Sequence, residues 1–382
     1  MTRAVRVAYD PSTVPADHPT HEAAVAFEGR PDPERTMHKP ETTSSELKLV
    51  AIGGGGGVSQ VLLGARPYFG SLTAAIAVTD TGRSTGTARA IAAMPAPGDV
   101  RNTLATLAGD PDGLLPRLMQ HRISSPAVPV LDGMAFGNLL IAALTQLTGD
   151  FAEAVEAAGQ LLGCTARILP ISTVNTHLCA ELVDGSVAEN ELAVRALNKA
   201  PISRLYLSTP GAPANPAVIQ AIQHADVVAI GPGSFFTSVL ASLLFDHVTE
   251  ALRETRATVV FICNTTTQPG QTDGFTIADH VRRLVDLLGP GTLDVALISR
   301  SEHIDRQVAA EYAAEGLHLL EPDEAELAQI AALGVQPLVR NLAEASEGKR
   351  TLWNKQDTIR HDPTLIGMAL WKIALDRGIS NP

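Results

Sequence analysis

Five consecutive glycines, Gly53–Gly57, stand between an apolar run, Leu49–Ile52, and a segment with helical spacing, Val58–Ala65. A phosphate group needs backbone N–H groups brought close with no Cβ atom in the way, and the start of a helix adds partial positive charge. No Gly-Lys-Ser/Thr follows the run, so ATP hydrolysis by a P-loop is disfavoured. We predict a phosphate-binding loop here. The competing interpretation is a tight turn that binds no ligand.

An acidic residue, Asp80, follows the next apolar run, Ala74–Val78, and opens a loop rich in hydroxyls and glycine that contains Ser84. A carboxylate at the end of a strand can accept hydrogen bonds from ribose hydroxyls, or it can hold Mg²⁺ against phosphates. The loop behind it suits an anion. The competing interpretation is an Asp that caps its own turn.

Two further loops follow apolar runs. Gly231, Gly233 and Ser234, with Thr237 close behind, predict a second anion-binding nest where a strand meets a helix, although a purely structural turn explains the pattern equally well. The last loop contains Asn264, Gln268 and Asp273, whose polar side chains can bind a base or a sugar. Ordinary loop residues would show the same pattern. The histidines show no metal-binding spacing, and no GxSxG elbow is present.

The order of apolar and helical patterns determines where these loops lie. Strands are expected at 49–52, 74–78, 226–230, 258–263 and 293–298, and helices at 58–65, 99–108, 139–147, 150–162, 277–288 and 362–375, with another starting at Asn215-Pro216. Such alternation predicts an α/β fold, a doubly wound, mostly parallel Rossmann-like sheet. Its ligands are expected at the carboxyl ends of the strands.

Local patterns assign two polar residues to helix starts. Asp99 and Asn138 are predicted to be N-caps, and Asp150 with Glu153 resembles a capping box. The Thr/Val-rich segment 164–215 is less helical and predicts an inserted hairpin subdomain. The proline-rich residues 1–46 predict a flexible extension with one strand at Val5–Tyr9, before a main domain at 47–382.

Composition limits the class of protein. The 382 residues are 45% hydrophobic and 18% charged, which is enough apolar material for a large core. With 29 Lys+Arg against 41 Asp+Glu, the net charge is −12, and no basic stripe supports nucleic-acid binding. Three distant cysteines indicate neither a disulfide framework nor a zinc site. No apolar stretch reaches the roughly 20 residues of a membrane span, so the expected location is the cytoplasm.

Six motifs occur in a fixed order: IGGGGGVS at 52–59, PGDVRN at 97–102, GNLLIAALTQLTGDF at 137–151, IGPGSFFTS at 230–238, NTTTQPGQTDGFTIADHV at 264–281 and RHDP at 360–363. From about Leu47 to its end, the chain resembles the CofD-like proteins and, within them, the YvcK branch, also called gluconeogenesis factors. The resemblance implies a doubly wound fold with an accessory insertion, and a nucleotide site at the carboxyl ends of the strands.

Members of that branch are regulators that bind UDP-sugars, above all UDP-N-acetylglucosamine, and support cell-wall synthesis and cell shape during gluconeogenic growth. The resemblance therefore implies a UDP-sugar or related nucleotide as partner and no required cofactor, with Mg²⁺ accompanying only the nucleotide. A homo-oligomer is compatible with it. The nucleotide-binding residues it implies, together with those above, are Gly53, Gly54, Gly55, Gly56, Gly57, Asp80, Ser84, Asp99, Asn102, Asn138, Gly231, Gly233, Ser234, Thr237, Asn264, Gln268, Asp273, Tyr312 and Arg360.

Departures from the branch pattern bear on catalysis. Gly56 stands where threonine is usual, and Thr81 replaces the second of two aspartates, which leaves Asp80 as a weak metal ligand. Met134 and Phe236 replace a histidine and a tyrosine. The alternative to a binding protein is a Mg²⁺-dependent CofD-like transferase that moves a phospholactyl-type group from a guanosine diphosphate donor to a deazaflavin alcohol. In that enzyme Asp80 would hold the metal. An NAD(P) protein is disfavoured, since no hydride-transfer partner is recognisable.

Overall fold

The computed structural model describes residues 46–300, 304, 306–344 and 359–380; the predicted extension and its strand at Val5–Tyr9 lie outside them. Seven parallel strands form the central sheet, in the order β10-β9-β8-β7-β1-β2-β3. The strands are β1 (Lys48–Gly53), β2 (Ser71–Ile76), β3 (Arg167–Pro170), β7 (Val227–Ile230), β8 (Thr258–Ile262), β9 (Val295–Ser299) and β10 (Gln336–Arg340). The predicted parallel α/β fold is confirmed.

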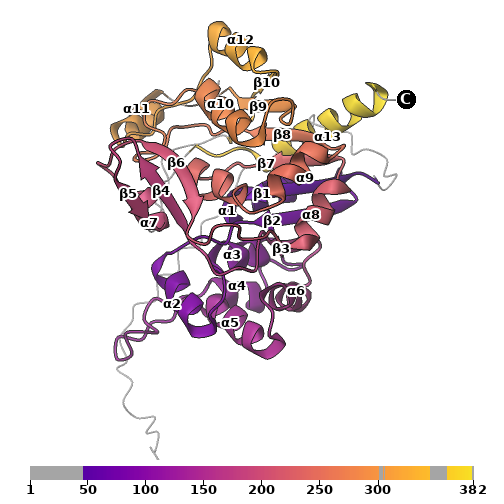
Figure 1. Cartoon of the computed structure of the whole chain (residues 1–382). Coiled ribbons are helices and arrows are strands. Elements are labelled where there is room, and N and C mark those ends of the chain that lie inside the picture. Colours follow the sequence, from indigo (N-terminus) through magenta and orange to yellow (C-terminus); the bar gives the residue numbers. More distant parts are fainter. Residues whose placement is uncertain (1–45, 301–303, 305, 345–358, 381–382) are drawn as a thin grey trace, which may run out of the picture. The chain divides into compact units, whose positions relative to one another are not determined.

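Helices flank this sheet (Figure 1). They are α1 (Gly55–Ala65), α2 (Arg83–Ala92), α3 (Gly98–Thr106), α4 (Leu114–Gln120), α5 (Phe136–Thr148), α6 (Phe151–Leu161), α8 (Pro216–Gln223), α9 (Val248–Glu254), α10 (Ile277–Leu288), α11 (Arg306–Ala314), α12 (Glu324–Ala332) and α13 (Pro363–Ser380), with a π-helix, η1 (Phe235–Leu240). The central strands are almost continuously aliphatic because both of their faces are buried. In the described ranges, no helix has the length and apolar character that a membrane span requires.

The chain changes direction across the sheet between β1 and β7. From β1 it proceeds to β2 and β3 on one side, and it later builds β7, β8, β9 and β10 outward on the other. β1 and β7 pair in register, from Leu49 opposite Val227 to Ile52 opposite Ile230. In open α/β sheets, such a reversal opens a crevice outside the carboxyl ends of the two strands. The glycine run and the Gly-Pro-Gly-Ser loop leave β1 and β7 at this point.

A second sheet lies within the 164–215 segment. It is antiparallel, in the order β5-β4-β6, and consists of β4 (Leu178–Leu182), β5 (Val187–Glu189) and β6 (Ile202–Leu207), with the short helix α7 (Glu191–Val194) after β5. In Figure 1 these elements lie together at the left of the drawing. The start of the segment differs, since β3 pairs with β2 in the central sheet.

Several predicted helix ends are confirmed. α10 has the predicted bounds and a capping box at Thr276, and the side chains of Asp150 and Asn215 cap α6 and α8. The predicted caps at Asp99 and Asn138 are wrong. Each residue lies inside its helix, behind Pro97 and Ala135. The side chain of Asn138 instead donates to Ser84 of α2.

Two helices cross at closely opposed glycines. A Cβ atom on Gly64 of α1 would overlap the carbonyl of Pro363, and one on Gly367 of α13 would overlap the backbone of Gly64. Since backbone atoms cannot move aside as a flexible side chain can, both positions require glycine. This crossing fixes α1, the helix that carries the glycine run, against the last helix of the chain.

Replacing Gly64 with alanine should lower the free energy of unfolding by about 1–3 kcal/mol through overpacking, despite alanine's better helix propensity. Gly159→Ala in α6 is the matched control, because its Cβ would make only an ordinary contact at 3.6 Å from Leu104 Cδ2. That variant should be unchanged or stabilised by up to about 1 kcal/mol. Chemical denaturation of both variants measures the difference, and equal stabilities would contradict the predicted overlap.

A buried histidine supports the helix that follows the β7 loop. The His280 ring packs with its centroid 4.6 Å from that of Phe235 and 5.4 Å from that of Phe275. Its Nδ1 donates to the Thr276 carbonyl at 2.7 Å, and its Nε2 is buried with no hydrogen-bond partner among the described residues. Burial lowers the pKa of His280 to about 4. A proton on Nε2 would be buried without an acceptor.

Acidification should therefore destabilise the protein through His280. The unfolded chain protonates this residue as the pH falls below about 6.5, while the folded chain keeps it neutral, so the stability present at pH 7 is reduced by about 2 kcal/mol at pH 5. His280→Asn preserves a donor to Thr276 and removes this linkage. Denaturant titrations between pH 7 and 5 should give a flatter pH dependence for the variant; parallel curves would refute the assignment.

Candidate functional site

Two of the five glycines are required by packing alone. A Cβ on Gly55 would overlap the backbone carbonyl of Asp99 at the start of α3, and one on Gly57 would overlap the carbonyl of Pro232 in the β7 loop. α1 begins at Gly55, inside the run rather than after it as predicted, because these residues continue the helix while lying against two other backbones. The glycine run therefore joins β1, α3 and the β7 loop.

Two other glycines face the site. A Cβ on Gly54 would lie 2.7 Å from Ser238 Oγ and 3.1 Å from Asp99 Oδ2, so this backbone lies beside a hydroxyl and a carboxylate. Gly56 is exposed, and nothing lies within 4 Å of the position that its Cβ would take. The run is therefore open to a ligand at Gly56, at the N-terminus of α1.

The β7 and β8 loops are joined by side-chain hydrogen bonds. Ser234 Oγ donates to Gln271 Oε1 at 3.0 Å and accepts from Thr237 Oγ1 at 2.8 Å. Gln268 Oε1 accepts from the backbone N–H of Phe235, which begins η1, at 2.8 Å. The first residues of η1 are thereby fixed against the loop that follows β8.

The same two loops meet at a buried amide. Asn264 Nδ2 donates to the carbonyl of Gly233 at 2.8 Å, while Gly231, at φ +81°, donates its N–H to Ile52 at the end of β1. Asn264 Oδ1 is buried and has no hydrogen-bond partner in the described part of the chain. A hydrogen-bond donor on a ligand can pair with this oxygen.

Asp80 organises the turn that leads into α2. Its Oδ1 accepts from the N–H of Gly82 at 2.7 Å, and its Oδ2 accepts from Thr85 Oγ1 at 3.0 Å. The residues from Arg83 onward are helical, whereas the sequence predicted a loop as far as residue 86. The carboxylate thus has the capping geometry that was the competing interpretation, at the carboxyl edge of the sheet.

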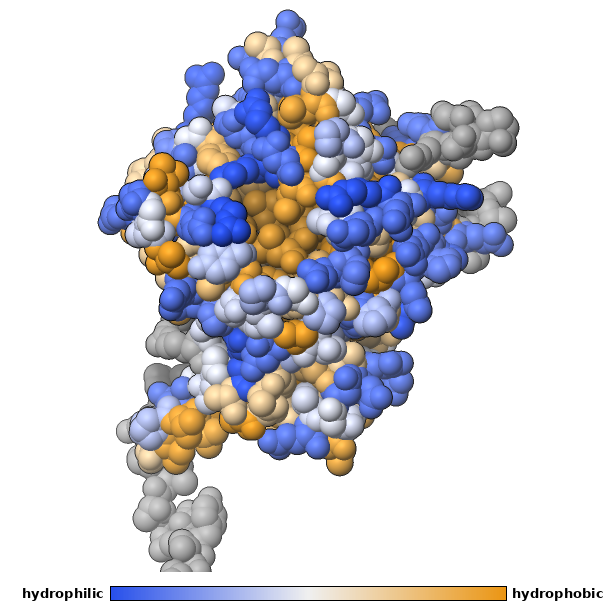
Figure 2. All heavy atoms as spheres, viewed as in Figure 1, coloured by the Kyte–Doolittle hydropathy of each residue, from blue (hydrophilic) through white to orange (hydrophobic). Residues whose placement is uncertain are grey.

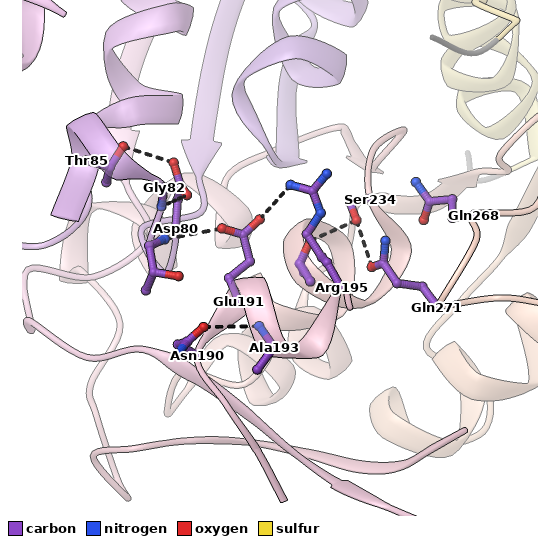
Figure 3. A network of polar contacts seen from close by, with 12 residues as sticks. Asp80, Gly82, Thr85, Asn190, Glu191, Ala193, Arg195, Ser234, Gln268 and Gln271 are labelled. Carbon is purple, nitrogen blue, oxygen red and sulfur yellow. Dashed lines mark hydrogen bonds and ion pairs between the residues drawn. The ribbon is translucent and has the colours of Figure 1, made fainter. Parts of the chain in front are cut away.

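A second carboxyl, which sequence reasoning missed, lies beside Asp80. Glu191 begins α7 in the inserted segment, is buried, and accepts from the N–H of Thr81 at 3.2 Å (Figure 3). Burial, followed by its hydrogen bond with Asp80, raises the pKa of Glu191 well above its usual range. Because the two residues are far apart in sequence, no local pattern could pair them. The one available signal for a carboxyl from elsewhere was Thr81, which stands where the branch usually has the second of two aspartates.

This carboxyl pair does not fit a divalent ion. An N–H donor and a hydroxyl donor already face the two Asp80 oxygens. Within the described ranges, no group of three or more His, Cys, Asp or Glu side chains is arranged to hold a metal ion. We therefore derive no role for Mg²⁺ at Asp80.

Three helices contribute further predicted residues. Asn138 of α5 is buried and donates from Nδ2 to Ser84 Oγ of α2 at 3.0 Å, while its Oδ1 has no hydrogen-bond partner among the described residues. Ser84 Oγ also accepts from the N–H of Ala135 at 2.9 Å. Asn102 of α3 accepts from Gln120 Nε2 at 2.9 Å. Asn138 therefore offers the site a second buried acceptor.

Three residues predicted to bind nucleotide contact segments other than the glycine run. Asp273 is exposed and closes a turn by accepting from Gly270 N–H at 2.7 Å. Tyr312 is buried in a small apolar cluster with Ile359. Arg360 is exposed and directly follows Ile359, whose carbonyl accepts from Thr265 Oγ1 at 2.6 Å. Tyr312 and Arg360 thus border the β8 loop.

A groove of about 380 Å³ lies elsewhere, lined by Leu243, Leu244, Phe245, Asp246, His247, Thr249, Glu250 and Leu287. Figure 2 shows an apolar hollow in the face that carries α9, α10 and β6. None of the residues predicted to bind nucleotide lines this groove. The loops at the carboxyl edge therefore remain the candidate site on chemical grounds.

The chain is similar to known proteins over most of its length. The family model described as 2-phospho-L-lactate transferase CofD matches residues 49–343. Proteins named gluconeogenesis factor from Halalkalibacterium halodurans and Bacillus subtilis are each 35% identical, over 84% and 82% of this chain and 95% and 94% of their own.

A crystal structure of a upf0052 family member from Bacillus halodurans superposes with a TM-score of 0.77 at 34% identity, covering 85% of this chain and 99% of that one. The family match extends from β1 past β10, and so includes all four loops of the site as well as the inserted sheet. The chain belongs to the CofD family.

Proposed function

We propose that this protein is a cytoplasmic regulator that binds a nucleotide-sugar of the UDP-N-acetylglucosamine type and links gluconeogenic growth to cell shape and cell-wall synthesis. The observation that carries the proposal is the convergence of glycine-rich and polar loops at the reversal between β1 and β7, with Gly56 open to a ligand. The regulatory part follows from the relatives named gluconeogenesis factors.

The start of α1 supports the diphosphate part of this ligand. The first N–H groups of a helix have no intrahelical acceptor and carry partial positive charge. Here they belong to glycines, so that an anion can approach the backbone at Gly56 without meeting a side chain. This combination is a recurrent phosphate site.

The buried amides support the remainder of the ligand. Asn138 and Asn264 each donate from Nδ2 to the protein and leave Oδ1 buried without a partner among the described residues. A buried acceptor without a partner costs about 1–3 kcal/mol, so a bound donor is favoured there. Sugar hydroxyls and the imide N–H of a uracil base are donors of the required kind.

The competing activity within the family is the transferase reaction of the CofD enzymes. That chemistry needs a group that stabilises charge at the transferred phosphoryl centre. Asp80, the expected metal ligand, instead accepts from the N–H of Gly82 and from Thr85 Oγ1. This arrangement favours binding over group transfer.

Calorimetry of the full chain with UDP-N-acetylglucosamine, UDP, GDP and NADP, in EDTA and in Mg²⁺, tests the proposal directly. We expect UDP-N-acetylglucosamine to bind in EDTA and more tightly than GDP or NADP. Binding of GDP alone, or turnover of a deazaflavin alcohol with a guanosine diphosphate donor, would replace the proposal with the transferase.

Gly56 offers a clean test of phosphate contact, because Gly55 and Gly57 are needed for packing. Gly56→Asp should weaken UDP-N-acetylglucosamine binding at least about tenfold, or 1.4 kcal/mol, by placing negative charge beside the phosphate. An acidic residue in the first helical turn should not lower the melting temperature. Gly56→Asn is the control of equal size, and equal affinities of the two variants would refute phosphate contact at this position.

Asp80 separates binding from catalysis. Asp80→Asn keeps the shape and an acceptor for Gly82 N–H, so we expect the affinity for UDP-N-acetylglucosamine to change by only about 1–2 kcal/mol, equally in EDTA and Mg²⁺. Calorimetry under both conditions checks this result. A Mg²⁺ requirement in the wild-type protein that disappears in the variant would instead assign Asp80 to a metal.

A further inference from the structure

We propose that Arg195, on the inserted segment, is the cation that neutralises the ligand's diphosphate. The inference rests on the proposed function and adds a residue that neither the sequence patterns nor the family resemblance assigned. It also gives the insertion a role in binding, because this segment brings a guanidinium to loops of the central sheet.

Carboxyl groups lie close to the glycine run before any ligand arrives. Asp99 Oδ2 lies beside Gly54, and Glu191 accepts from the N–H of Thr81, the residue after Asp80. A diphosphate approaching these carboxyls is repelled unless a cation lies nearby. Backbone amides supply only partial charge, so a guanidinium that can contact the phosphates strengthens binding.

Among the described side chains near these carboxyls, two other guanidinium groups keep their charge but direct their N–H donors to protein acceptors. Arg89 donates to Asn175 Oδ1 at 3.0 and 2.7 Å, to the carbonyl of Thr176 at 3.0 Å and to that of Asp80 at 3.4 Å. Arg101 donates to the carbonyl of Met119 at 3.2 Å and to Gln120. These contacts fix the two side chains to structural acceptors.

Arg195 is different. Its only hydrogen-bond partner among the described residues is Glu191, at 3.4 Å from NH1 to Oε1, and its side chain is 37% exposed. Its Nε and NH2 groups make no hydrogen bond to the described residues. Because a guanidinium presents several N–H groups in one plane, it can bind two phosphate oxygens at once.

The position of Arg195 suits this role. Figure 3 shows its guanidinium between Glu191 on one side and Ser234 on the other. Its carbonyl lies 3.1 Å from the position that a Cβ on Gly270 would take, and the next residue, Gln271, accepts from Ser234 Oγ at 3.0 Å. Arg195 thus lies beside the β8 loop, which is joined to the β7 loop through Gln271 and Ser234.

The segment that carries Arg195 is held at both ends. Glu191 accepts from Thr81 N–H at 3.2 Å, in the β2 loop, and Lys199 Nζ donates to the carbonyl of Gly270, in the β8 loop. Directly before Glu191, Asn190 Oδ1 caps α7 by accepting from Ala193 N–H at 3.1 Å. Such anchoring positions the guanidinium before a ligand binds, which reduces the entropy cost of binding.

Calorimetry of Arg195→Gln with UDP and with uridine tests the inference. We expect UDP affinity to fall at least about tenfold, and uridine affinity to stay within about twofold, because only UDP carries the diphosphate. Arg204→Gln is the matched control: it makes the same charge change in the inserted sheet, at an exposed ion pair with Glu181. That variant should bind UDP as the wild-type protein does.

The outcomes separate this inference from the proposed function. Failure of the wild-type protein to bind UDP or UDP-N-acetylglucosamine would overturn both. Wild-type binding of UDP together with unchanged affinity in Arg195→Gln would overturn the role of Arg195 alone. If Arg195→Gln does not fold, Arg195→Lys replaces it: it keeps the charge but loses the planar fork, and a selective loss of UDP over uridine affinity is expected. Equal losses for the two ligands would refute the assignment.

Discussion

The structure depends on the close approach of three backbones at the strand reversal. Gly55 lies against the carbonyl of Asp99, and Gly57 lies against the carbonyl of Pro232. A Cβ atom at either position would separate α1 from α3 or from the β7 loop. The same absence of side chains leaves helix N–H groups open at Gly56. Packing and ligand access therefore use different members of one glycine run.

Much of the fold could be predicted from the sequence because buried parallel strands are continuous aliphatic runs. The runs at 49–52, 226–230 and 258–263 all became strands of the central sheet. The bounds of α10 were predicted exactly as observed, since its apolar face and its capping box at Thr276 are local signals. The starts of α3 and α5 were not, because both helices begin before Asp99 and Asn138, and the Asn138 side chain donates to Ser84 of α2.

The site was predictable only in part, for a related reason. Each loop could be recognised from its own glycines and polar residues, and each leaves the carboxyl end of a strand. Contacts between the loops could not be recognised. Thr81 and Glu191 are 110 residues apart, and nothing in either neighbourhood identifies the other. Arg195 was missed because one arginine directly after a short helix resembles any surface charge until its neighbours are known.

The strand order also has a consequence for how the chain folds. β1 pairs with β2 soon after both are synthesised, but its other edge waits for β7, across a contact that spans 178 residues between Lys48 and Asp226. Until then, an aliphatic strand has an unpaired edge, which is a template for association with other chains. Long-range parallel pairing is also intrinsically slow. β1, an interior strand of the finished sheet, is thus a vulnerable edge strand in the nascent one, and the ligand crevice is among the last features to form.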